Sequence, residues 1–382
     1  MNFLKFFSEE KELLKKIAVI FFASRLFVFL IGFFSVFVVP KSRFFVSSNS
    51  LFDLFFYWDS VWYISIVERG FSYIPGEFST VAFFPLYPLL IKLFSFVLFD
   101  SKLSGYLISN ISFFLALFFL YKLISLDYSK SIASKTVFFI SIAPLTFFFS
   151  IIYTEGLFVF LAILSFYFAR KKQWFYASVS GFFLALTNVL GVLIIIPLLM
   201  EYFDLTLKNL NLNYFRLLIK KIEPDIFFFS LPPLGLLTYM FYLFLEFNEP
   251  LAFKKALFDW SAREFVPFFV TLTRWSYDNF FHPYNLYVFL FIFVGVFFLA
   301  YLIHSKVRPS YVVFPSVLFF FYLSSNSLEG IPRYVSFLFP LYLGVALLSE
   351  KNKNLNRLLI LFSLSLLIFC TVLFVNGYFL ND

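Results

Sequence analysis

Long runs of apolar residues recur along this chain of 382 residues. The runs are Ile17–Val39, Leu103–Leu120, Thr136–Ile152, Asp225–Leu245, Leu286–Ile303, Arg333–Leu348 and Leu358–Val375. A helix of about 20 apolar residues crosses the hydrocarbon core of a bilayer. Hydrophobic residues make up 62% of the chain and charged residues 14%, against about half and about a quarter in a soluble domain. The sequence therefore predicts an all-α, polytopic integral membrane protein with one membrane domain over residues 1–382.

The basic residues predict which side of the membrane each loop faces. Short loops rich in Lys and Arg stay on the cytoplasmic side, so we expect the N-terminus and residues 170–172 (Arg-Lys-Lys) there. This assignment holds if Phe83–Phe99, which contains Pro85, Pro88 and Lys92, lies at the membrane interface. If that segment spanned, every later loop would change sides. We therefore favour an interfacial or re-entrant helix over a spanning one.

The same topology requires Trp174–Tyr202 to form a helical hairpin. Asn188 and Gly191 favour a turn at residues 187–191. The alternative is one long tilted helix, which would invert all that follows. The hairpin predicts about 11 spans, with the C-terminus outside. It also places two long loops outside, residues 40–102 with juxtamembrane helices and residues 247–284, together with the short polar stretch Ser324–Arg333.

Several enzyme classes lack their motifs in this sequence. The 12 glycines form no phosphate loop, and the two histidines and one cysteine, Cys370, form no metal set. No Gly-x-Ser-x-Gly nucleophile motif is present. The net charge of +8 does not indicate nucleic acid, because the basic residues are scattered. We expect no cofactor, no metal and no nucleic-acid partner.

Carboxylates, arginines and aromatic residues instead gather in the predicted outer loops. This combination suits a lipid-linked substrate, whose tail lies among membrane lipids while its phosphate lies at the headgroup level. Asp59 stands between Trp58 and Trp62, which share one face of a helix predicted over residues 60–69 and ended by Gly70. Asp59 is either the N-cap of this helix, with the tryptophans as an interfacial belt, or a partly desolvated general base.

Three other sets of residues, each with a charged member, allow two interpretations. Glu68 and Arg69 form a surface pair or present an arginine to a phosphate. Tyr153 and Glu155 cap a helix end or belong to a site. Arg333, followed by Tyr334 at a predicted helix start, is disfavoured there by the helix dipole, so we expect an anionic partner, either a carboxylate of this chain or a lipid phosphate.

Arg25, inside the first apolar run, differs from these groups because it lies within a predicted span. Long basic side chains near a membrane surface extend their charged heads into water. We expect Arg25 to extend toward the inner membrane surface in this way.

Four sequence blocks, in order, resemble the PIG-V-type mannosyltransferases, the GPI mannosyltransferase II family and its prokaryotic relatives, within the GT-C superfamily. The first block is Trp-Asp-Ser-x-Trp-Tyr (58–63), followed by Glu-Arg-Gly-Phe (68–71) and Ala82–Leu89. The second is Tyr-Thr-Glu-Gly-Leu-Phe (153–158), and the fourth is Pro332–Tyr342. The third, Leu186–Gly191, departs from the family pattern because Asn188 stands where arginine is expected.

This resemblance implies a GT-C fold and a polyprenyl-phosphate-linked sugar donor, typically mannose, transferred with inversion to an acceptor hydroxyl. It implies that Asp59 is the base or acceptor-orienting group. We expect Arg333 first, and Arg263 second, to hold the leaving phosphate, Glu155 to position the sugar or acceptor, and Trp58 or Trp62 to stack on a sugar. The acceptor would be a glycolipid or a glycan. The site would face the outside of the plasma membrane in a prokaryote, or the lumen of the endoplasmic reticulum in a eukaryote.

Two rival functions remain open at this level. A flippase or transporter for lipid-linked sugars would share the membrane fold but would require polar residues along several mid-membrane helices. A non-catalytic membrane assembly subunit would not require Asp59.

Overall fold

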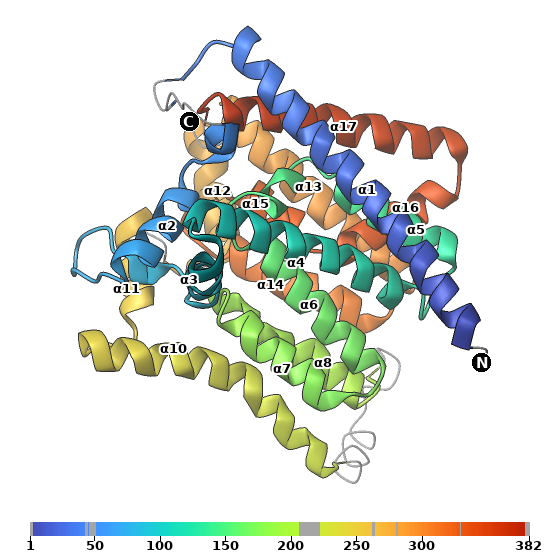
Figure 1. Cartoon of the computed structure of the whole chain (residues 1–382), viewed down its shortest axis with the longest axis horizontal. Coiled ribbons are helices and arrows are strands. Elements are labelled where there is room, and N and C mark those ends of the chain that lie inside the picture. Colours follow the sequence, from blue (N-terminus) through green and yellow to red (C-terminus); the bar gives the residue numbers. More distant parts are fainter. Residues whose placement is uncertain are drawn as a thin grey trace.

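The apolar runs form helices in the computed structural model, which describes residues 3–42, 45, 51–205, 222–261, 264–279, 282–328 and 330–378 (Figure 1). The α-helices are α1 (Phe3–Val38), α2 (Asp59–Arg69), α3 (Leu86–Leu98), α4 (Ser101–Ile124), α5 (Lys130–Ser141), α6 (Glu155–Arg170), α7 (Trp174–Ala185), α8 (Ile195–Tyr202), α10 (Leu231–Phe247), α11 (Ala252–Ser261), α12 (Phe268–Asn279), α13 (Pro283–His304), α14 (Pro309–Leu323), α15 (Ile331–Ser336), α16 (Pro340–Glu350) and α17 (Lys353–Val375). Short 3₁₀ helices are η1 (Leu51–Phe55), η2 (Thr80–Ala82), η3 (Thr146–Phe149), η4 (Val189–Ile194) and η5 (Pro224–Ser230). Within the described residues the only β-type pairing is the isolated bridge between Phe265 and Ser325.

Five of these helical stretches are long and apolar enough to cross a membrane. They are Glu10–Val38, Ser101–Ile124, Pro224–Phe247, Tyr284–His304 and Lys353–Val375. Their outer faces carry bare apolar side chains, such as Phe37, which is 72% exposed, and Phe293, which is 68% exposed. Such surfaces are unfavourable in water and suited to lipid. The prediction of an all-α integral membrane protein is confirmed, whereas the count of about 11 spans stays a prediction.

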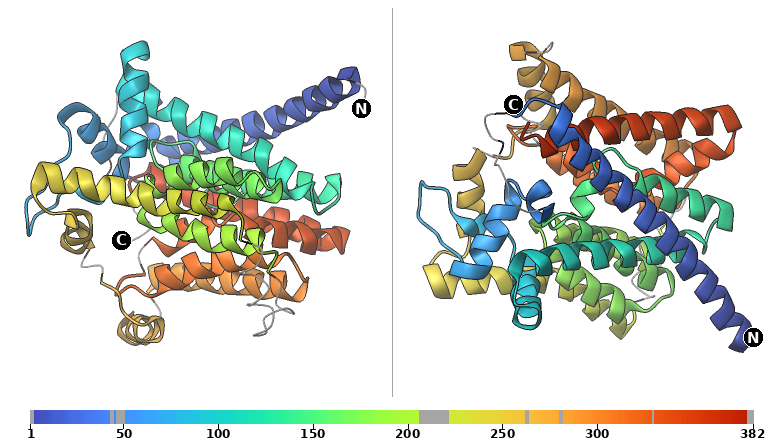
Figure 2. Two further views of the ribbon diagram at one scale, coloured as in Figure 1. Left: turned by 90° about the horizontal axis from the view of Figure 1, so that it is seen from below. Right: turned by 45° about the horizontal axis from the view of Figure 1, so that its top comes forward.

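Helix α3 covers the segment whose placement decided the topology. It has 13 residues, which corresponds to about 20 Å, shorter than the roughly 30 Å hydrocarbon core. Figures 1 and 2 show it at a steep angle to α4 and to the long helices. Its buried face is tied to α4, where the Tyr87 hydroxyl contacts Gly105 O at 3.0 Å and Ser109 Oγ at 2.7 Å. These features favour the interfacial interpretation, and the position of α3 in the membrane stays a prediction.

The predicted hairpin over 174–202 is present. Helices α7 and α8 run in opposite directions, so that the ring centres of Trp174, at the start of α7, and Tyr202, at the end of α8, lie 5.2 Å apart. Asn188 caps the turn, its Oδ1 accepting a hydrogen bond from Leu190 N–H at 2.9 Å. Gly191 is required there, because a Cβ would lie 2.3 Å from Leu184 O. One long tilted helix is therefore excluded.

Two apolar runs that looked continuous in sequence are broken in the structure. The run Thr136–Ile152 is split into α5 and η3, with Pro144 between them. The run Arg333–Leu348 is split into α15 and α16, with Pro340 at the start of α16. Proline cannot donate the backbone hydrogen bond that a helix interior needs, and α5 and α16 pack against each other. Residues of the candidate site lie next to both interruptions.

Arg25 also differs from the prediction. Its guanidinium turns inward and donates to Ser141 O and Thr146 O, each within 2.9 Å, instead of extending to a membrane surface. The interruption after α5 leaves backbone carbonyls that need donors inside the bundle. Arg25 therefore satisfies carbonyls inside the bundle.

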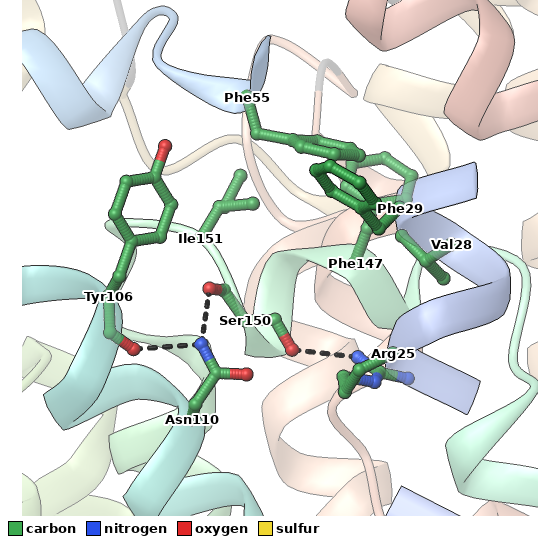
Figure 3. Close-up of a pocket in the computed structure, with 9 residues that line it drawn as sticks. All are labelled: Arg25, Val28, Phe29, Phe55, Tyr106, Asn110, Phe147, Ser150 and Ile151. Atoms are coloured by element: carbon green, nitrogen blue, oxygen red, sulfur yellow. Dashed lines mark hydrogen bonds between the residues drawn. The ribbon is translucent and has the colours of Figure 1, made fainter. Parts of the chain in front are cut away.

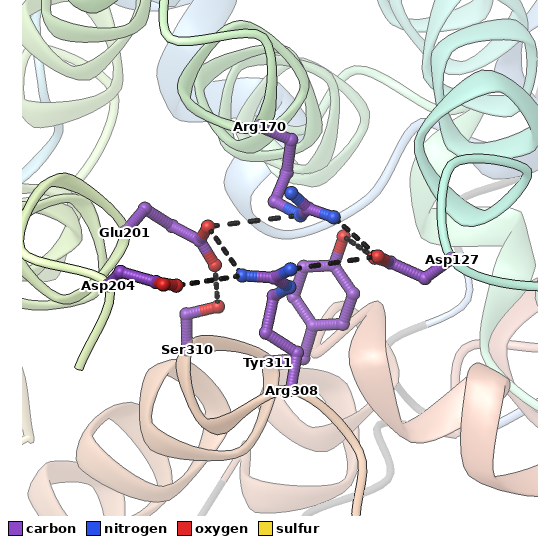
Figure 4. Close-up of polar contacts among 7 residues, drawn as sticks. All are labelled: Asp127, Arg170, Glu201, Asp204, Arg308, Ser310 and Tyr311. Atoms are coloured by element: carbon purple, nitrogen blue, oxygen red, sulfur yellow. Dashed lines mark hydrogen bonds and ion pairs between the residues drawn. The ribbon is translucent and has the colours of Figure 1, made fainter. Parts of the chain in front are cut away.

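Charged residues assigned to the cytoplasmic side lie together at one end of the bundle, called here the Arg170 end (Figure 4). Arg170, at the end of α6, pairs with Asp127 and lies 3.8 Å from Glu201 Oε2. Arg308 Nη1 lies 3.1 Å from the same oxygen. Lys122, in the last turn of α4, pairs with Glu10 of α1, and Lys135 of α5 pairs with Glu350, the last residue of α16. Since α6 connects this cluster to Glu155, the candidate site lies at the opposite end, called here the Asp59 end.

Candidate active site

Helix α2 presents Asp59 at its first position. Trp58 precedes it with φ 56° and makes no side-chain cap bond to the helix. Gly70 ends the helix with φ 83°, and its N–H donates to Ile66 O at 2.8 Å. The helix and its glycine stop were predicted correctly. The interpretation of Asp59 as the N-cap is wrong, because Trp58 holds that position and Asp59 is the first residue of the helix. The Asp59 carboxylate instead accepts a hydrogen bond from a side chain far away in sequence.

That side chain is Arg333, on the short helix α15. Arg333 Nη1 donates to Asp59 Oδ2 at 2.7 Å, and Arg333 Nε lies 3.2 Å from Glu155 Oε1. The three residues come from α2, α15 and the start of α6, so three separate parts of the chain meet here. Asp59, Glu155 and Arg333 are called the triad below. Of the two partners foreseen for Arg333, this structure selects carboxylates of the chain itself.

The triad is partly enclosed by aromatic rings. The guanidinium carbon of Arg333 lies 5.8, 5.5 and 5.3 Å from the ring centres of Phe148, Tyr153 and Tyr334. Tyr153 also accepts a hydrogen bond from the Asp59 backbone N–H at 3.2 Å. Cation–π contacts of this kind add to the ion pairs and limit the rotamers of the guanidinium.

The charges of the triad do not balance. Two carboxylates face one guanidinium, so the ionised triad carries a net charge of −1. The Asp59 side chain is 30% exposed, whereas that of Glu155 is 6% exposed. Glu155 Oε2 is buried and has no hydrogen-bond partner within the described part of the chain. An acceptor oxygen in this state is poised to receive a donor from a bound molecule, because leaving it unpaired is costly.

The triad opens into a cavity of about 420 Å³. Its walls come from α2, η2, α6, the hairpin turn and the two later loops. The lining residues used below are Asp59, Tyr63, Glu155, Asn188, Trp260, Glu264, Tyr322, Ser324, Ser325, Ser327, Arg333 and Tyr334. Burial raises the pKa of the Tyr63 hydroxyl well above its ordinary value, and the Asp59 and Glu155 charges add to this effect. Tyr63 therefore remains a hydroxyl donor.

The cavity is covered by contacts between the long loops. Trp260, on α11, donates from Nε1 to Ser79 O at 2.8 Å and packs edge-on against Trp62 at 4.8 Å. Glu264 N–H donates to Asn326 Oδ1 at 3.1 Å, next to the Phe265–Ser325 bridge. The two long loops and the polar stretch at 324–333 thus form one wall.

The predicted site residues separate into four groups. Asp59, Glu155, Asn188, Arg333 and Tyr334 line the cavity, and Asn188 also caps its own turn. Tyr153 and Trp62 each contact a lining residue. The Tyr153 hydroxyl accepts a hydrogen bond from the Asp59 N–H, and Trp62 packs edge-on against Trp260. Trp58 packs against the core, and Glu68 with Arg69 is exposed at the other end of α2. Arg263 lies outside the described residues. The catalytic role of Asp59 and the substrate roles of all the other predicted residues stay predictions.

Sequence reasoning missed several lining residues. Tyr63 stood inside the first block without a role, and Trp260 and Glu264 were two of many residues in a long loop. The serines at 324, 325 and 327 belong to the polar stretch that was noted without a function. The only sequence feature that could have indicated these lining residues was a short polar run next to a helix end. Among the described residues, no group of three His, Cys, Asp or Glu side chains could hold a metal ion.

Comparison with known proteins gives a likeness of architecture only. No family model and no curated protein matches the sequence. Among solved structures, the chain is similar to the oligosaccharyltransferase of Archaeoglobus fulgidus. In the structure tethered to an acceptor peptide with the NVT sequon, identity is 13%, coverage is 95% of this chain and 56% of that chain, and the TM-score is 0.47.

Two further structures of the archaeal enzyme give similar values. The complex of AglB with an inhibitory peptide and a dolichol-phosphate has 12% identity, coverage of 94% and 56%, and a TM-score of 0.46. The complex with Zn and sulfate has 13% identity, coverage of 93% and 52%, and a TM-score of 0.43. The chain thus spans about half the length of these structures. The resemblance to PIG-V-type enzymes stays a prediction.

Proposed function

We propose that this protein is a glycosyltransferase that moves a hexose from a polyprenyl-phosphate donor to an acceptor hydroxyl. The observation that carries the proposal is the triad in the wall of a cavity lined in part by aromatic rings, at one end of a membrane bundle. The sequence blocks that resemble mannosyltransferases contribute every member of the triad, and they favour mannose as the sugar.

In this proposal Asp59 takes the proton from the attacking hydroxyl, or orients that hydroxyl. Asp59 is the more exposed carboxylate of the triad, so an acceptor can reach it. Its hydrogen bond to Arg333 fixes the carboxylate in the wall of the cavity. The hydroxyl becomes strongly acidic as its oxygen bonds to the sugar carbon, and a carboxylate within reach can then accept its proton.

Glu155 and the surplus negative charge would act on the sugar itself. Bond cleavage at the sugar carbon develops positive charge on the ring, as in other glycosyl transfers. With both carboxylates ionised, the triad would carry a net negative charge beside that ring, in a cavity lined in part by aromatic side chains. Fixed charges in such a site stabilise the transition state more strongly than the same charges in water.

Arg333 has a double role in this proposal. Its Nη1 and Nε face the two carboxylates, whereas its Nη2 makes none of the described hydrogen bonds. A departing phosphate could approach Nη2 while the carboxylates stay in place, so that its charge is held without a protonating acid. Arg263, outside the described residues, is the second candidate for this contact.

A lipid-linked donor is supported by a second cavity, which is apolar and lies next to α15. It measures about 110 Å³ and lies among α13, α16 and α17, with Val335, Ser336 and Phe362 in its wall. Val335 and Ser336 follow Arg333 by two and three residues. A polyprenyl chain could therefore lie among these helices while its phosphate reaches the triad.

The test uses purified protein in liposomes with radiolabelled polyprenyl-phosphate sugars and added glycolipids. Wild type is expected to consume one donor, and Asp59→Asn to lower the rate by about 10²–10⁴, the usual contribution of a general base. Asp53→Asn is the matched control, since Asp53 lies in the same loop but pairs with Lys102 at 2.7 Å, away from the cavity. A folded wild type that consumes no donor, or an Asp59→Asn variant with full activity, would refute the proposal.

A further inference from the structure

Thirteen residues between α5 and α6, called here the inserted segment (residues 142–154), bring much of the site into place. The segment supplies Phe148 and Tyr153, which face Arg333, and it leads directly into Glu155. Apart from η3 it is not helical, and nearly all of its side chains are buried. Non-helical backbone at membrane depth persists only where protein groups satisfy its polar atoms.

Arg25 of α1 supplies several of those groups. Its Nη1 donates to Thr146 O at 2.8 Å and to Ser150 Oγ at 2.9 Å. Its Nη2 donates to Ser141 O and Thr146 Oγ1, both at 2.9 Å, and its Nε donates to Ser24 Oγ at 3.3 Å. A guanidinium has five N–H donors, so all five are used, and four of them reach the inserted segment and the end of α5 before it.

Helix α4 holds the same segment from the other side, as Figure 3 shows for Asn110 and Ser150. Asn110 Nδ2 donates to Ser150 O at 2.8 Å, and Ser109 Oγ donates to Tyr153 O at 3.2 Å. Gly156 allows the close approach, because a Cβ there would lie 2.8 Å from Phe149 O and 2.9 Å from Ser109 O. The segment is thus clamped between α1 and α4.

The charge of Arg25 belongs to this clamp and not to a ligand site. No carboxylate pairs with Arg25 within the described residues; its charge faces Ser141 O at the C-terminal end of α5, where the helix dipole favours a cation. The adjoining cavity of about 250 Å³ is lined mainly by apolar residues such as Phe29, Phe55 and Phe147. With every donor used, Arg25 has none left for a bound molecule.

We infer that Arg25 is a positioning residue for the site, acting through the inserted segment. The chain of contacts runs from Arg25 to Thr146 and Ser150, and along the segment to Tyr153, whose hydroxyl accepts the Asp59 N–H. The same segment sets where Glu155 meets Arg333. The inference rests on the proposed function for its catalytic readout, and its structural readout is independent of that function.

The test compares Arg25→Met and Arg25→Lys with Leu26→Ala, a matched control because Leu26 is the next residue of α1 and is 58% exposed on the outer face. Both Arg25 variants are expected to lower kcat by about 100-fold, the loss that a misplacement of about 1 Å can cause. The KM for the donor should change less than about twofold, because the inserted segment affects the transition state and not ground-state binding. Lysine keeps the charge but has three donors on one atom, so Arg25→Lys should not restore the wild-type kcat.

Hydrogen–deuterium exchange gives the second readout. Backbone amides of residues 146–154 should exchange faster in both Arg25 variants, while those of α10 and α17 keep their wild-type rates. Arg25→Lys keeps the charge and most of the volume. If Arg25→Met does not fold, the kcat and exchange rates of Arg25→Lys alone test the inference. Unchanged kcat with unchanged exchange at 146–154, or an increase spread evenly over all helices, would overturn the inference. Failure of the proposed function looks different, because wild type itself would then consume no donor.

Discussion

Arg333 contacts two carboxylates at once, and this geometry depends on the planar, forked guanidinium. Arg333→Lys keeps the charge but offers one ammonium, which cannot face Asp59 Oδ2 and Glu155 Oε1 from the positions of Nη1 and Nε. We expect a loss of about 10²-fold in kcat, similar to the loss of one oxyanion-type donor. Steady-state kinetics in liposomes measure it. A lysine variant with wild-type kcat would show that the charge alone matters.

The stability of Arg333 variants should depend on how many unpaired carboxylates they leave in the triad. Arg333→Met leaves two carboxylates side by side, and removing one partner of a buried pair costs about 3 kcal/mol. Adding Glu155→Gln to Arg333→Met should restore part of this loss, because the uncompensated buried charge is gone. Thermal unfolding of the single and double variants in detergent gives the comparison. A double variant less stable than Arg333→Met would mean that Glu155 stabilises the fold without Arg333.

At the scale of elements, the turn between α7 and α8 depends on Gly191. A methyl group there would lie 2.3 Å from Leu184 O, a backbone atom that cannot move alone. We expect Gly191→Ala to cost about 1–3 kcal/mol by overpacking. Gly295→Ala in α13 is the control, because its nearest neighbour is the Phe319 ring tip at 3.1 Å and alanine favours the helix. The prediction fails if thermal unfolding shows equal stability for both variants.

For the whole molecule, the charge distribution predicts the orientation in the membrane. The Arg170 end gathers the basic loops and should face the cytoplasm, so the Asp59 end should face outside. The single native cysteine, Cys370, is buried, so introduced cysteines can be labelled selectively. Glu68→Cys, at an exposed position on α2 at the Asp59 end of the bundle, should react with a membrane-impermeant maleimide on intact cells. Lys172→Cys, exposed at the Arg170 end, should react only after permeabilisation, and the reverse pattern would invert the topology.

Much of the helical framework could be predicted from local sequence. Helix α2, its stop at Gly70 and the hairpin at Asn188 and Gly191 follow from apolar periodicity and turn residues, which act over a few positions. The interruptions after α5 and before α16 were missed, although Pro144 and Pro340 were visible. An apolar run with one proline is compatible with a kinked helix as well as with a break.

The sequence by itself determined the membrane environment, the all-α class and the three residues of the triad, because length, hydropathy and short motifs are local properties. Only the tertiary structure decided what those residues contact. Arg333 and Asp59 are separated by 274 positions, and Arg25 lies more than 100 positions before the carbonyls that it binds. Such partners are chosen by how helices pack, since a buried charge takes whichever acceptors the packing brings within hydrogen-bond distance. Sequence could therefore state that Arg333 needed an anion, but not which one.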